Sequence, residues 1–445
     1  MGWASEEFDT IDLGDARLNK RAVTLAEAFA DSPTASIPGA CHDRAELRAA
    51  YRFFDHEDVG FWDVLEPHMR CTERRMAAHP VVLCLQDTSS LDFNGRDIEG
   101  LGPLSYEPQR GLHVHPTYAV TPGREPLGIL DCWNWARQFK DDGGERPSDV
   151  IESRRWVDGY ERIAEVAATM PGTRLVHIGD RESDMSALMK RAATLGQPAD
   201  WLVRAKTDRV LGGEDADGAK LFATVAATEA LGEVRFVYRP RRGNKARDVV
   251  QQIHLKRVLL GKRDKLGATC VIAREADPPA GEKPIEWRLL TNREITTLEE
   301  AAELIDWYRA RWEVEMFFDV LKNGCRVEQL QLHTLERLEV ALALFMIVAW
   351  RINRLMRLGR ECPEMDAAVI FEPEEIVAAY ALNKHKVPEG TAPLGEVMRL
   401  VAMAGGFIGR KGDGDPGVRT IWRGMEKVMS FADGIRWSRA HADPG

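Results

Sequence analysis

One segment, residues 305–322 with the sequence IDWYRARWEVEMFFDVLK, constrains this chain more than any other. It contains Tyr308, Arg311, Glu315 and Lys322 in the spacing Y-x2-R-x3-E-x6-K. On a continuous α-helix, at about 100° per residue, these four side chains fall within an arc of roughly 60°. The spacing therefore predicts that a carboxylate, two cations and a phenol project from one narrow face. Such a face suits a phosphate held beside a metal ion.

Two aspartates follow apolar, strand-like runs upstream of this segment. Asp87 comes after VVLCLQ, and Asp180 comes after RLVHIG. Open α/β sheets place their sites beyond the carboxyl ends of strands, so these two aspartates could meet there and the helical Glu315 could close the site. Carboxylates are the usual ligands of the two Mg²⁺ ions that assist phosphodiester cleavage. The sequence therefore predicts a Mg²⁺ site for phosphodiester chemistry.

Each acid alone is weaker evidence than the three together. An aspartate after a strand is more often a turn or helix-cap residue, and a helical glutamate near arginines is more often part of a surface ion pair. Glu313, two positions before Glu315, is the natural decoy. The four-residue spacing combined with both aspartates in order is the specific signal.

Composition bounds the class of protein. The 445 residues leave room for two or three domains, and the net charge of −10 argues against a general polyanion binder while leaving room for local basic patches. The seven cysteines are scattered with no CxxC pair, which fits a reducing cytosol. The N-terminus is acidic and unlike a signal peptide. The longest apolar run, residues 341–350, is too short for a bilayer, so we expect a soluble cytoplasmic protein without a membrane partner.

The pattern of the chain predicts an α/β fold. Residues 1 to about 75 read as helical, with helices near 15–30 and 43–54. The following segments alternate in a βββαβαβ order, typical of a mixed sheet with helical cover and of the ribonuclease-H-like fold. The expected strands are 81–86, 111–120, 126–135, 175–179 and 201–205, and the expected helices are 153–169 and 184–195.

A β-rich, polar insertion interrupts this core between about 207 and 283. Ten Lys or Arg but only two Asp lie between Tyr238 and Lys265. The basic run could be a solvated hairpin, but within a nuclease we favour DNA contact for its residues, Arg239, Arg241, Arg242, Lys245 and Arg247. Helical sequence resumes near Leu298 and continues to about Leu358, with a break expected at Asn323-Gly324.

These residues together resemble a known group, the bacterial DDE transposases of the insertion-sequence-four family with the YREK signature, which includes the enzyme of the kanamycin-resistance transposon. LQDTSSLDF around Asp87 resembles the family's first-aspartate motif, and GDRESDM around Asp180 resembles its D-R-E-x-D motif. The resemblance covers nearly the whole chain. LGDARLNKRAVTLAEAFADSP and AYRFF look like a transposon-end-binding domain, and AMAGGFIGRKGDGDPGVRTIWRGME looks like a segment that supports subunit pairing.

The resemblance implies three domains and a set of site residues. Residues 1–75 would be a helical end-binding domain, 76–365 the ribonuclease-H-like catalytic domain with its β-rich insertion, and 366–445 a helical domain for dimerisation and DNA contact. Asp87, Asp180 and Glu315 would be both the catalytic and the metal-binding residues for two Mg²⁺ ions, which Mn²⁺ can replace. Tyr308, Arg311 and Lys322 would hold DNA phosphates near the cut.

Further DNA contacts are expected outside the signature. Trp287 matches a family tryptophan that stacks on a base flipped out during hairpin formation, although a core strand aromatic is an equal alternative. Arg204 and Lys206 follow the last core strand and could face the same groove. Arg17, Lys20 and Arg21 could line one helix edge and contact phosphates, unless they scatter around the surface. His113 and His115 share one strand face, where a packed or DNA-near pair is favoured over a metal site because no third ligand is evident nearby.

The resemblance implies a cut-and-paste transposase in the bacterial cytoplasm, associated with the nucleoid. It would bind double-stranded transposon ends as a homodimer on paired ends, cleave them through a hairpin, and join the 3′-ends to target DNA. One alternative is a stand-alone ribonuclease-H-like endonuclease that cleaves without strand transfer. Another is a domesticated, non-catalytic DNA-binding protein, which the presence of all three acids disfavours.

Overall fold

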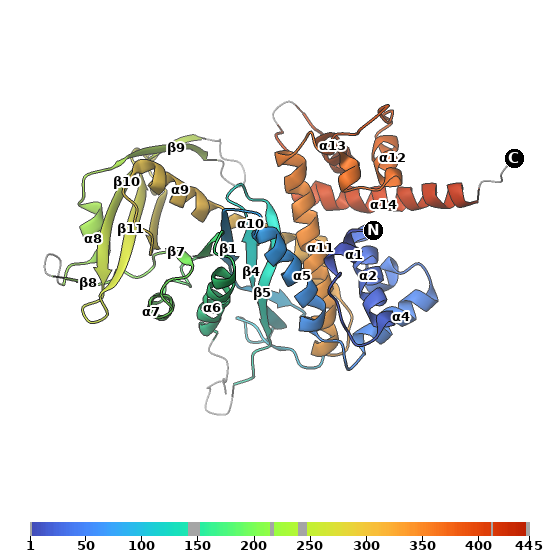
Figure 1. Ribbon diagram of the computed structural model, residues 1–445, viewed down its shortest axis with the longest axis horizontal. Helices are drawn as coiled ribbons and strands as arrows, with labels where there is room; N and C mark the ends of the chain where they lie inside the picture. Colours follow the sequence, from blue (N-terminus) through green and yellow to red (C-terminus); the bar gives the residue numbers. More distant parts are fainter. Residues whose placement is uncertain (1, 141–151, 214–217, 239–246, 411–412, 442–445) are drawn as a thin grey trace. The chain divides into compact units, whose positions relative to one another are not determined.

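The computed structural model describes residues 2–140, 152–213, 218–238, 247–410 and 413–441 (Figure 1). The chain forms two compact units, each built from separate stretches of sequence. Unit 1 comprises Met1–Arg75, Thr88–Ser148 and Glu313–Gly445, and unit 2 comprises Met76–Asp87 and Asp149–Trp312. Within the described residues, no helix has both the length and the apolar character needed to cross a membrane.

Unit 2 is built on a mixed sheet whose parallel part carries the first two predicted acids. Strands β1 (Val81–Gln86), β6 (Arg174–Gly179) and β7 (Asp200–Arg204) run parallel to one another. The run VVLCLQ is buried along nearly all of β1, as expected for a strand that is covered on both faces. Helix α6 (Arg154–Thr169) packs on β1 and β6 and against α7 (Ser186–Thr194).

The insertion extends this sheet instead of forming a separate module (Figure 1). Strand β12 (Glu286–Thr291) pairs antiparallel with β7, β11 (Leu266–Glu275) pairs with β12, and the long β10 (Arg247–Leu260) pairs with β11. The short β8 (Leu211–Gly212) and β9 (Gly232–Tyr238) both pair with β10, and α8 (Leu221–Ala226) packs on β10 and β11. The predicted interruption of the core is therefore continuous with it through backbone hydrogen bonds.

Unit 1 contains the N-terminal helices, a set of antiparallel strands and the C-terminal helices. Among these strands, β4 (Arg110–Val120) pairs with β5 (Pro126–Trp135) and with the short β2 (Ser89–Asp92) and β3 (Gly102–Pro103). The five core strands and two helices expected from the sequence are all present, within a few residues of the predicted bounds. The chain therefore has the mixed α/β class that its pattern predicted.

The helices of unit 1 gather around one long apolar helix. The N-terminal helices are α1 (Trp3–Glu7), α2 (Ala16–Asp31), α3 (Ile37–Ala40), α4 (Arg44–Phe54) and α5 (Phe61–Met76). The C-terminal helices are α11 (Leu335–Glu361), α12 (Pro373–Leu382), α13 (Leu394–Ala404) and α14 (Val418–Ala440), with a short 3₁₀ turn at Ala367–Val369. The apolar run 341–350 is buried in α11, which packs against α2, α13 and β5, and Phe345 stacks on Phe29 of α2 with ring centroids 4.6 Å apart.

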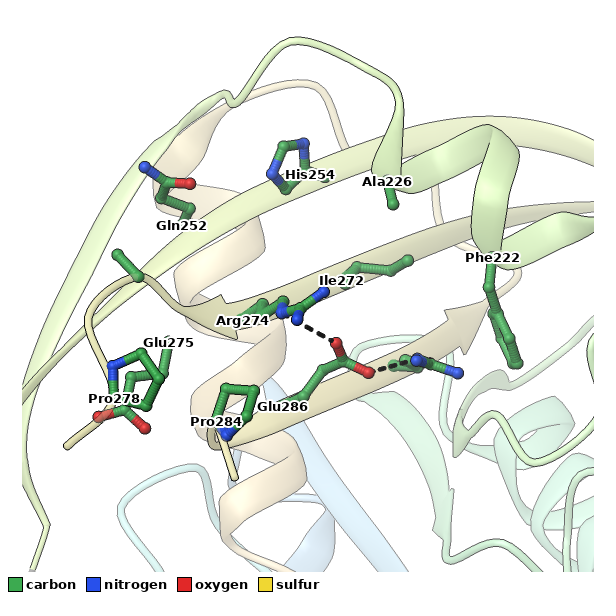
Figure 2. A pocket seen from close by; sticks show the side chains of 12 residues that line it. Phe222, Ala226, Gln252, His254, Ile272, Arg274, Glu275, Pro278, Pro284 and Glu286 are labelled. Atoms are coloured by element: carbon green, nitrogen blue, oxygen red, sulfur yellow. Dashed lines mark ion pairs between the residues drawn. The ribbon is translucent and has the colours of Figure 1, made fainter. Parts of the chain in front are cut away.

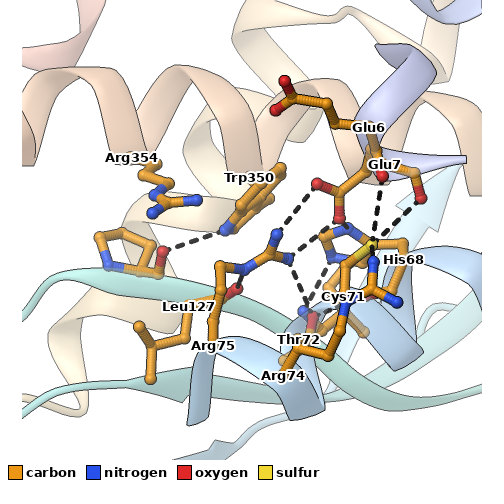
Figure 3. A network of polar contacts seen from close by, with 12 residues as sticks. Glu6, Glu7, His68, Cys71, Thr72, Arg74, Arg75, Leu127, Trp350 and Arg354 are labelled. Atoms are coloured by element: carbon orange, nitrogen blue, oxygen red, sulfur yellow. Dashed lines mark hydrogen bonds and ion pairs between the residues drawn. The ribbon is translucent and has the colours of Figure 1, made fainter. Parts of the chain in front are cut away.

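A buried polar network joins α1 to α5, β5 and α11 (Figure 3). Glu7 accepts two hydrogen bonds of 3.0 Å from Arg75, and its Oε1 lies 2.5 Å from Nδ1 of His68. The backbone N–H of Ile129 donates to Nε2 of His68, so the proton of a neutral ring sits on Nδ1 and points at Glu7. Arg75 also lies over the ring of Trp350 at 4.3 Å. These contacts satisfy a carboxylate that is only 5% exposed.

The segment 305–322 is not the single regular helix that its spacing suggested. Helix α9 (Leu298–Arg309) begins at Leu298, as expected, and a Thr297–Glu300 capping box precedes it. It ends before Arg311, whose N–H donates to the Tyr308 carbonyl. Helix α10 (Trp312–Asp319) follows and runs into a π-helical turn, Val320–Gly324, which holds Lys322. A 3₁₀ turn, Val327–Gln329, comes next. The interval of about 100° per residue therefore does not hold between Tyr308 and Lys322.

Candidate functional site

Asp87 and Asp180 follow neighbouring parallel strands in unit 2. The pairing of β1 with β6 sets Val81 against Arg174 and Leu85 against Ile178. The same register, extended by two residues, sets Asp87 against Asp180. Neighbouring strands lie about 4.8 Å apart, so the two carboxylates start from adjacent backbone positions at the carboxyl edge of the sheet.

A tight turn fixes the backbone around Asp180. Its Oδ1 accepts a hydrogen bond of 2.7 Å from the N–H of Glu182. Its carbonyl accepts from both the N–H and the hydroxyl of Ser183, at 3.2 and 2.8 Å. A Cβ on Gly179 would lie 2.2 Å from the Ser183 hydroxyl, so a glycine is required where the strand enters the turn.

Cationic and phenolic side chains surround these two aspartates within unit 2. Arg311 donates from Nη1 to Oδ2 of Asp87 at 2.9 Å, and both side chains are largely buried, at 14% and 22% exposure. Burial raises the pKa of the Tyr308 hydroxyl; Arg311 and Arg204 oppose this shift and Asp180 adds to it. Five predicted residues (Asp87, Asp180, Arg204, Tyr308 and Arg311) therefore belong to one local electrostatic environment.

Glu315 and Lys322 lie in unit 1. Glu315 is half-buried on α10, whereas the decoy Glu313 is 4% exposed and bound to Arg357, with one hydrogen bond of 3.0 Å from Nε. Lys322 donates from Nζ to the carbonyl of Ser90 at 2.6 Å. Burial lowers the pKa of the Lys322 ammonium, an effect that the carboxylates of Glu328 and Asp92 oppose.

Trp287 is half-buried on β12 and stacks on Phe236 of β9, with ring centroids 5.8 Å apart and an interplanar angle of 15°. Arg309 lies over the other aromatic partner, 5.4 Å from the Phe236 centroid. The tryptophan is thus packed on an aromatic neighbour without being fully enclosed. These surroundings are compatible with both alternatives predicted for Trp287, a core aromatic and a side chain that stacks on a base.

The remaining predicted DNA contacts lie in different parts of the chain. Lys206 is exposed and Arg204 is half-buried at the end of β7. Arg17, Lys20 and Arg21 all lie on the first half of α2; Lys20 is exposed, Arg21 is half-buried, and the Arg17 side chain is 91% exposed beside Asp15. Arg247 forms an ion pair with Glu275. The other residues of the basic run lie outside the described residues: Arg239, Arg241, Arg242 and Lys245.

A separate pocket of about 460 Å³ opens on one face of the insertion strands (Figure 2). Glu286 lies between two arginines there, 3.7 Å from Arg274 and 2.5 Å from Arg288, while Glu275 is paired with Arg247. The charges lining this pocket are therefore balanced. Of the residues predicted for catalysis or DNA contact that the structure describes, none lines it.

The two histidines of β4 are engaged in packing and hydrogen bonds. Nδ1 of His113 lies 3.1 Å from the Ser90 hydroxyl, and Nδ1 of His115 lies 2.8 Å from the Thr88 hydroxyl. His113 also stacks on Trp135. Across the described residues, no group of three or more His, Cys, Asp or Glu is arranged to hold a metal ion. The hydrogen bonds and the ring stacking show both histidines engaged within the protein.

Comparison with protein families divides the chain in the order that the sequence motifs suggest. A transposase DNA-binding model matches residues 1–59, a transposase DDE domain model matches residues 177–351, and a Tn5 transposase dimerisation domain model matches residues 347–445. The chain has the three domains of a DDE transposase. It therefore has a ribonuclease-H-like core, flanked by a transposase DNA-binding region and a transposase dimerisation region.

Among solved structures, the chain is similar to a piggyBac transposase synaptic complex with hairpin DNA. The sequence identity is 9% and the TM-score is 0.36. The match covers 91% of this chain and 62% of that one, so this chain spans less than two thirds of the other chain's length.

The transposase DDE domain implies a divalent metal ion, typically Mg²⁺. Asp87 and Asp180 fit that requirement by the chemistry of their oxygen donors and by their shared register at the strand ends. The DDE match starts at residue 177, so it contains Asp180 and Glu315 but not Asp87. For Asp87, the pairing of β1 with β6 is the structural support.

Sequence reasoning missed one acid close to this site. Asp184 lies four residues after Asp180, inside the motif GDRESDM, and its side chain is fully buried. Its position four residues after Asp180 in the same motif was the only sequence feature that pointed to it. The burial of its carboxylate could not be predicted from the sequence, because aspartates in turns are usually solvated.

Proposed function

We propose that this protein is a cut-and-paste DNA transposase of the insertion-sequence-four family, similar to the enzyme of the kanamycin-resistance transposon, with Asp87, Asp180 and Glu315 as catalytic, metal-binding residues. The observation that carries the proposal is the register of β1 with β6, which starts two carboxylates from adjacent positions at the carboxyl edge of a parallel sheet. Arg311, from the same signature as Glu315, binds one of them.

The three carboxylates would hold two Mg²⁺ ions, which Mn²⁺ can replace. Such ions, when bound, lower the pKa of a nucleophilic water and stabilise the leaving oxygen of an in-line displacement. Asp87 would be shared between both ions, and Asp180 and Glu315 would each complete one. The Arg311 guanidinium compensates the charge of Asp87.

The basic and phenolic residues around the aspartates would hold DNA phosphates. Arg311 offers a fork of donors for bidentate phosphate contact, whereas Lys322 and Lys206 act as point charges. Tyr308 and Arg204 share the environment of Asp180 and would contact the same strand. Trp287 would stack on a base flipped from the duplex, which offsets part of the few kcal/mol that extrusion costs.

The reaction would proceed through a hairpin. Water first displaces a 3′-oxygen at the transposon end, and the freed 3′-hydroxyl then attacks the phosphate of the opposite strand. Each step breaks one P–O bond and forms one, so no oxidant or other co-reactant is needed. A second water opens the hairpin, and the 3′-ends join target DNA by the same displacement.

The domain organisation follows from this role. Residues 1–75 would bind the transposon end, with Arg17, Lys20 and Arg21 on phosphates, and the basic run Arg239, Arg241, Arg242 and Lys245 would contact DNA from the insertion. Residues 76–365 would be the catalytic domain, and residues 366–445 would pair two subunits on two ends. We place the protein in the bacterial cytoplasm, associated with the nucleoid.

The test combines end selection with a joining assay. End fragments are selected from random duplex DNA by affinity for the full-length protein and then incubated with a supercoiled target plasmid and Mg²⁺. Wild-type protein is expected to yield hairpin ends and joined products. The variants Asp87→Asn, Asp180→Asn and Glu315→Gln are expected to bind the selected ends but to yield neither product. Cleavage without any joined product would favour a stand-alone nuclease. Binding by wild type without cleavage would favour a non-catalytic DNA-binding protein.

A further inference from the structure

Asp184 makes an unusual set of contacts for a residue in a turn. Its side chain is 0% exposed, and Oδ2 accepts hydrogen bonds from the backbone N–H groups of Lys206 and Thr207, at 2.7 and 2.8 Å. Its Oδ1 lies 2.5 Å from Nη1 of Arg209, and its carbonyl accepts a bond of 2.9 Å from Nη2 of the same guanidinium. Through these contacts, Asp184 fixes the segment 206–209 to the turn that follows β6.

The two segments it joins emerge from neighbouring parallel strands. Val176 to Gly179 of β6 pair with Asp200 to Val203 of β7. The turn after β6 begins with Asp180, and the segment after β7 begins with Ala205, whose N–H donates to the carbonyl of Arg288 on β12. Asp184 therefore fixes how the backbone of Lys206 lies relative to Asp180.

The contacts of Asp184 exclude the role that its motif first suggests. A carboxylate in GDRESDM invites comparison with the metal-binding candidate Asp180, but the oxygens of Asp184 are committed to two backbone donors and one guanidinium. A buried carboxylate with such a donor set is stable only while it keeps them. Its environment is that of a structural anchor beside a reactive site.

We infer that Asp184 is a positioning residue that holds Lys206 on the DNA phosphate nearest to Asp180. The inference rests on the proposed function, because it requires Lys206 to contact DNA. Lys206 is exposed, and its backbone N–H is bound by Asp184, so its side chain starts from a fixed point at the carboxyl edge of the sheet. A loop that carried Lys206 without this anchor would have to be ordered by DNA at an entropic cost.

The substitution Asp184→Asn separates this role from simple space filling. The amide has the same shape, but in one orientation its NH₂ faces Arg209, and in the other it faces the N–H groups of Lys206 and Thr207. Either orientation sets donor against donor, so the segment 206–209 is released while the side-chain volume is kept.

The salt dependence of DNA binding reports this release directly. Each lost phosphate contact reduces the slope of log K against log salt by about 0.9 on duplex DNA. Binding to a fixed random-sequence duplex in EDTA is measured for wild type, Lys206→Ala, Asp184→Asn and the double variant. We expect each single variant to lose about one phosphate contact and the double variant to lose no more than Lys206→Ala. Asp264→Asn, which removes a surface carboxylate paired with Lys190 at 2.8 Å, is the matched control and should keep the wild-type slope.

The outcomes distinguish the inference from the proposed function. A wild-type slope for Asp184→Asn, or additive losses in the double variant, would overturn the inference while leaving end cleavage by the wild type untouched. A wild-type slope for Lys206→Ala would overturn it as well. Failure of the wild type to bind DNA would overturn both. If Asp184→Asn does not fold, Arg209→Gln is used instead, because it removes the guanidinium that binds Asp184. This variant is also expected to lower the slope.

Discussion

Arg311 donates from Nη1 to Oδ2 of Asp87 over 2.9 Å, so a guanidinium occupies one oxygen of the carboxylate that we propose as the shared metal ligand. Both groups are largely buried, which strengthens their attraction relative to a surface pair. The ion pair holds the Asp87 carboxylate in place. It also competes with a divalent cation for the same oxygen.

Removal of Arg311 should therefore change metal binding and DNA binding in opposite directions. We expect Arg311→Ala to bind Mn²⁺ several-fold more tightly in the absence of DNA, because a competing cation is lost. It should also bind DNA more weakly and cut it at least about 100-fold more slowly, since a charge that positions phosphate is gone. Mn²⁺ titration by electron paramagnetic resonance measures the first effect. Arg162→Ala on α6, which removes an arginine 3.6 Å from Glu165, is the control; weaker Mn²⁺ binding by Arg311→Ala would contradict the competition.

Two glutamates on α10 should respond to substitution in opposite ways. Glu315→Gln is expected to abolish cleavage, by about 1,000-fold or more, with a thermal midpoint close to that of wild type. Glu313→Gln should instead destabilise the fold by roughly 3 kcal/mol, because Glu313 is 4% exposed and its loss leaves Arg357 without its carboxylate. Paired melting curves and cleavage rates test both. A destabilised Glu315→Gln or a fully stable Glu313→Gln would contradict the assignment of Glu315 to catalysis and of Glu313 to the fold.

The network around Glu7 predicts a loss of stability in acid. Burial by itself raises the pKa of Glu7, but its interactions with His68 and Arg75 outweigh burial and lower the pKa to about 2, from 4.5. A carboxyl whose folded pKa lies below its unfolded value contributes stability above the unfolded pKa and loses it as the pH falls toward the folded one. The contribution at pH 7 is about 3 kcal/mol and disappears between about pH 5 and pH 2.

Glu7→Gln should accordingly be less stable than wild type at pH 7, and the difference should shrink as the pH is lowered below about 4. Urea unfolding followed by tryptophan fluorescence at a series of pH values measures this, since Trp350 lies in the network (Figure 3). Glu6→Gln on the neighbouring position provides the control. A difference that stays constant with pH would contradict the role of the carboxylate charge.

Asp31 at the end of α2 predicts the opposite dependence. Burial, together with the charges of Glu375 and Asp433, raises the pKa of Asp31 to about 7, which Arg351 and Arg436 oppose. A raised carboxyl pKa removes stability as the pH rises from the unfolded value of 3.8 through 7. Because Asp31 is half-buried, the discounted effect is about 2 kcal/mol.

Asp31→Asn should therefore stabilise the protein, and by more at pH 8 than at pH 5. Melting temperatures of wild type and Asp31→Asn at pH 5 and pH 8 measure the gain in stability. Asp43→Asn, at the N-cap of α4, is a useful contrast, because its carboxylate accepts from Ala45 and Glu46 and its pKa is lowered. A gain for Asp31→Asn that is equal at both values would argue against a titrating carboxyl at this position.

The strands of the core could be predicted because their apolar runs are long and their turns are marked. The run VVLCLQ before Asp87 and the run RLVHIG before Asp180 became β1 and β6 almost to the residue. The sequence did not predict that these two strands pair with each other, because the choice of partner strand in a parallel sheet depends on the whole topology. The common register of the two aspartates emerges only from that pairing.

The helix that carries the signature was predicted in its extent but not in its regularity. No Pro or Gly stands between Tyr308 and Lys322 to mark the turn at Arg311. The expected break at Asn323-Gly324 lies inside the π-helical turn, where Gly324 marks its end. The roles of the site residues themselves stay predictions, since spacing along a broken helix does not fix where side chains converge.

The discontinuous make-up of the two units has a consequence for biosynthesis. Phe29 of α2 stacks on Phe345 of α11, so Phe29 gains this aromatic partner only after the ribosome has passed residue 345. Unit 2 ends at Trp312, which leaves the exit tunnel earlier. A nascent chain can therefore assemble its second unit while the first is still missing its central helix. Truncation before α11 would leave Phe29, and the face of α2 that packs on α11, without their partner.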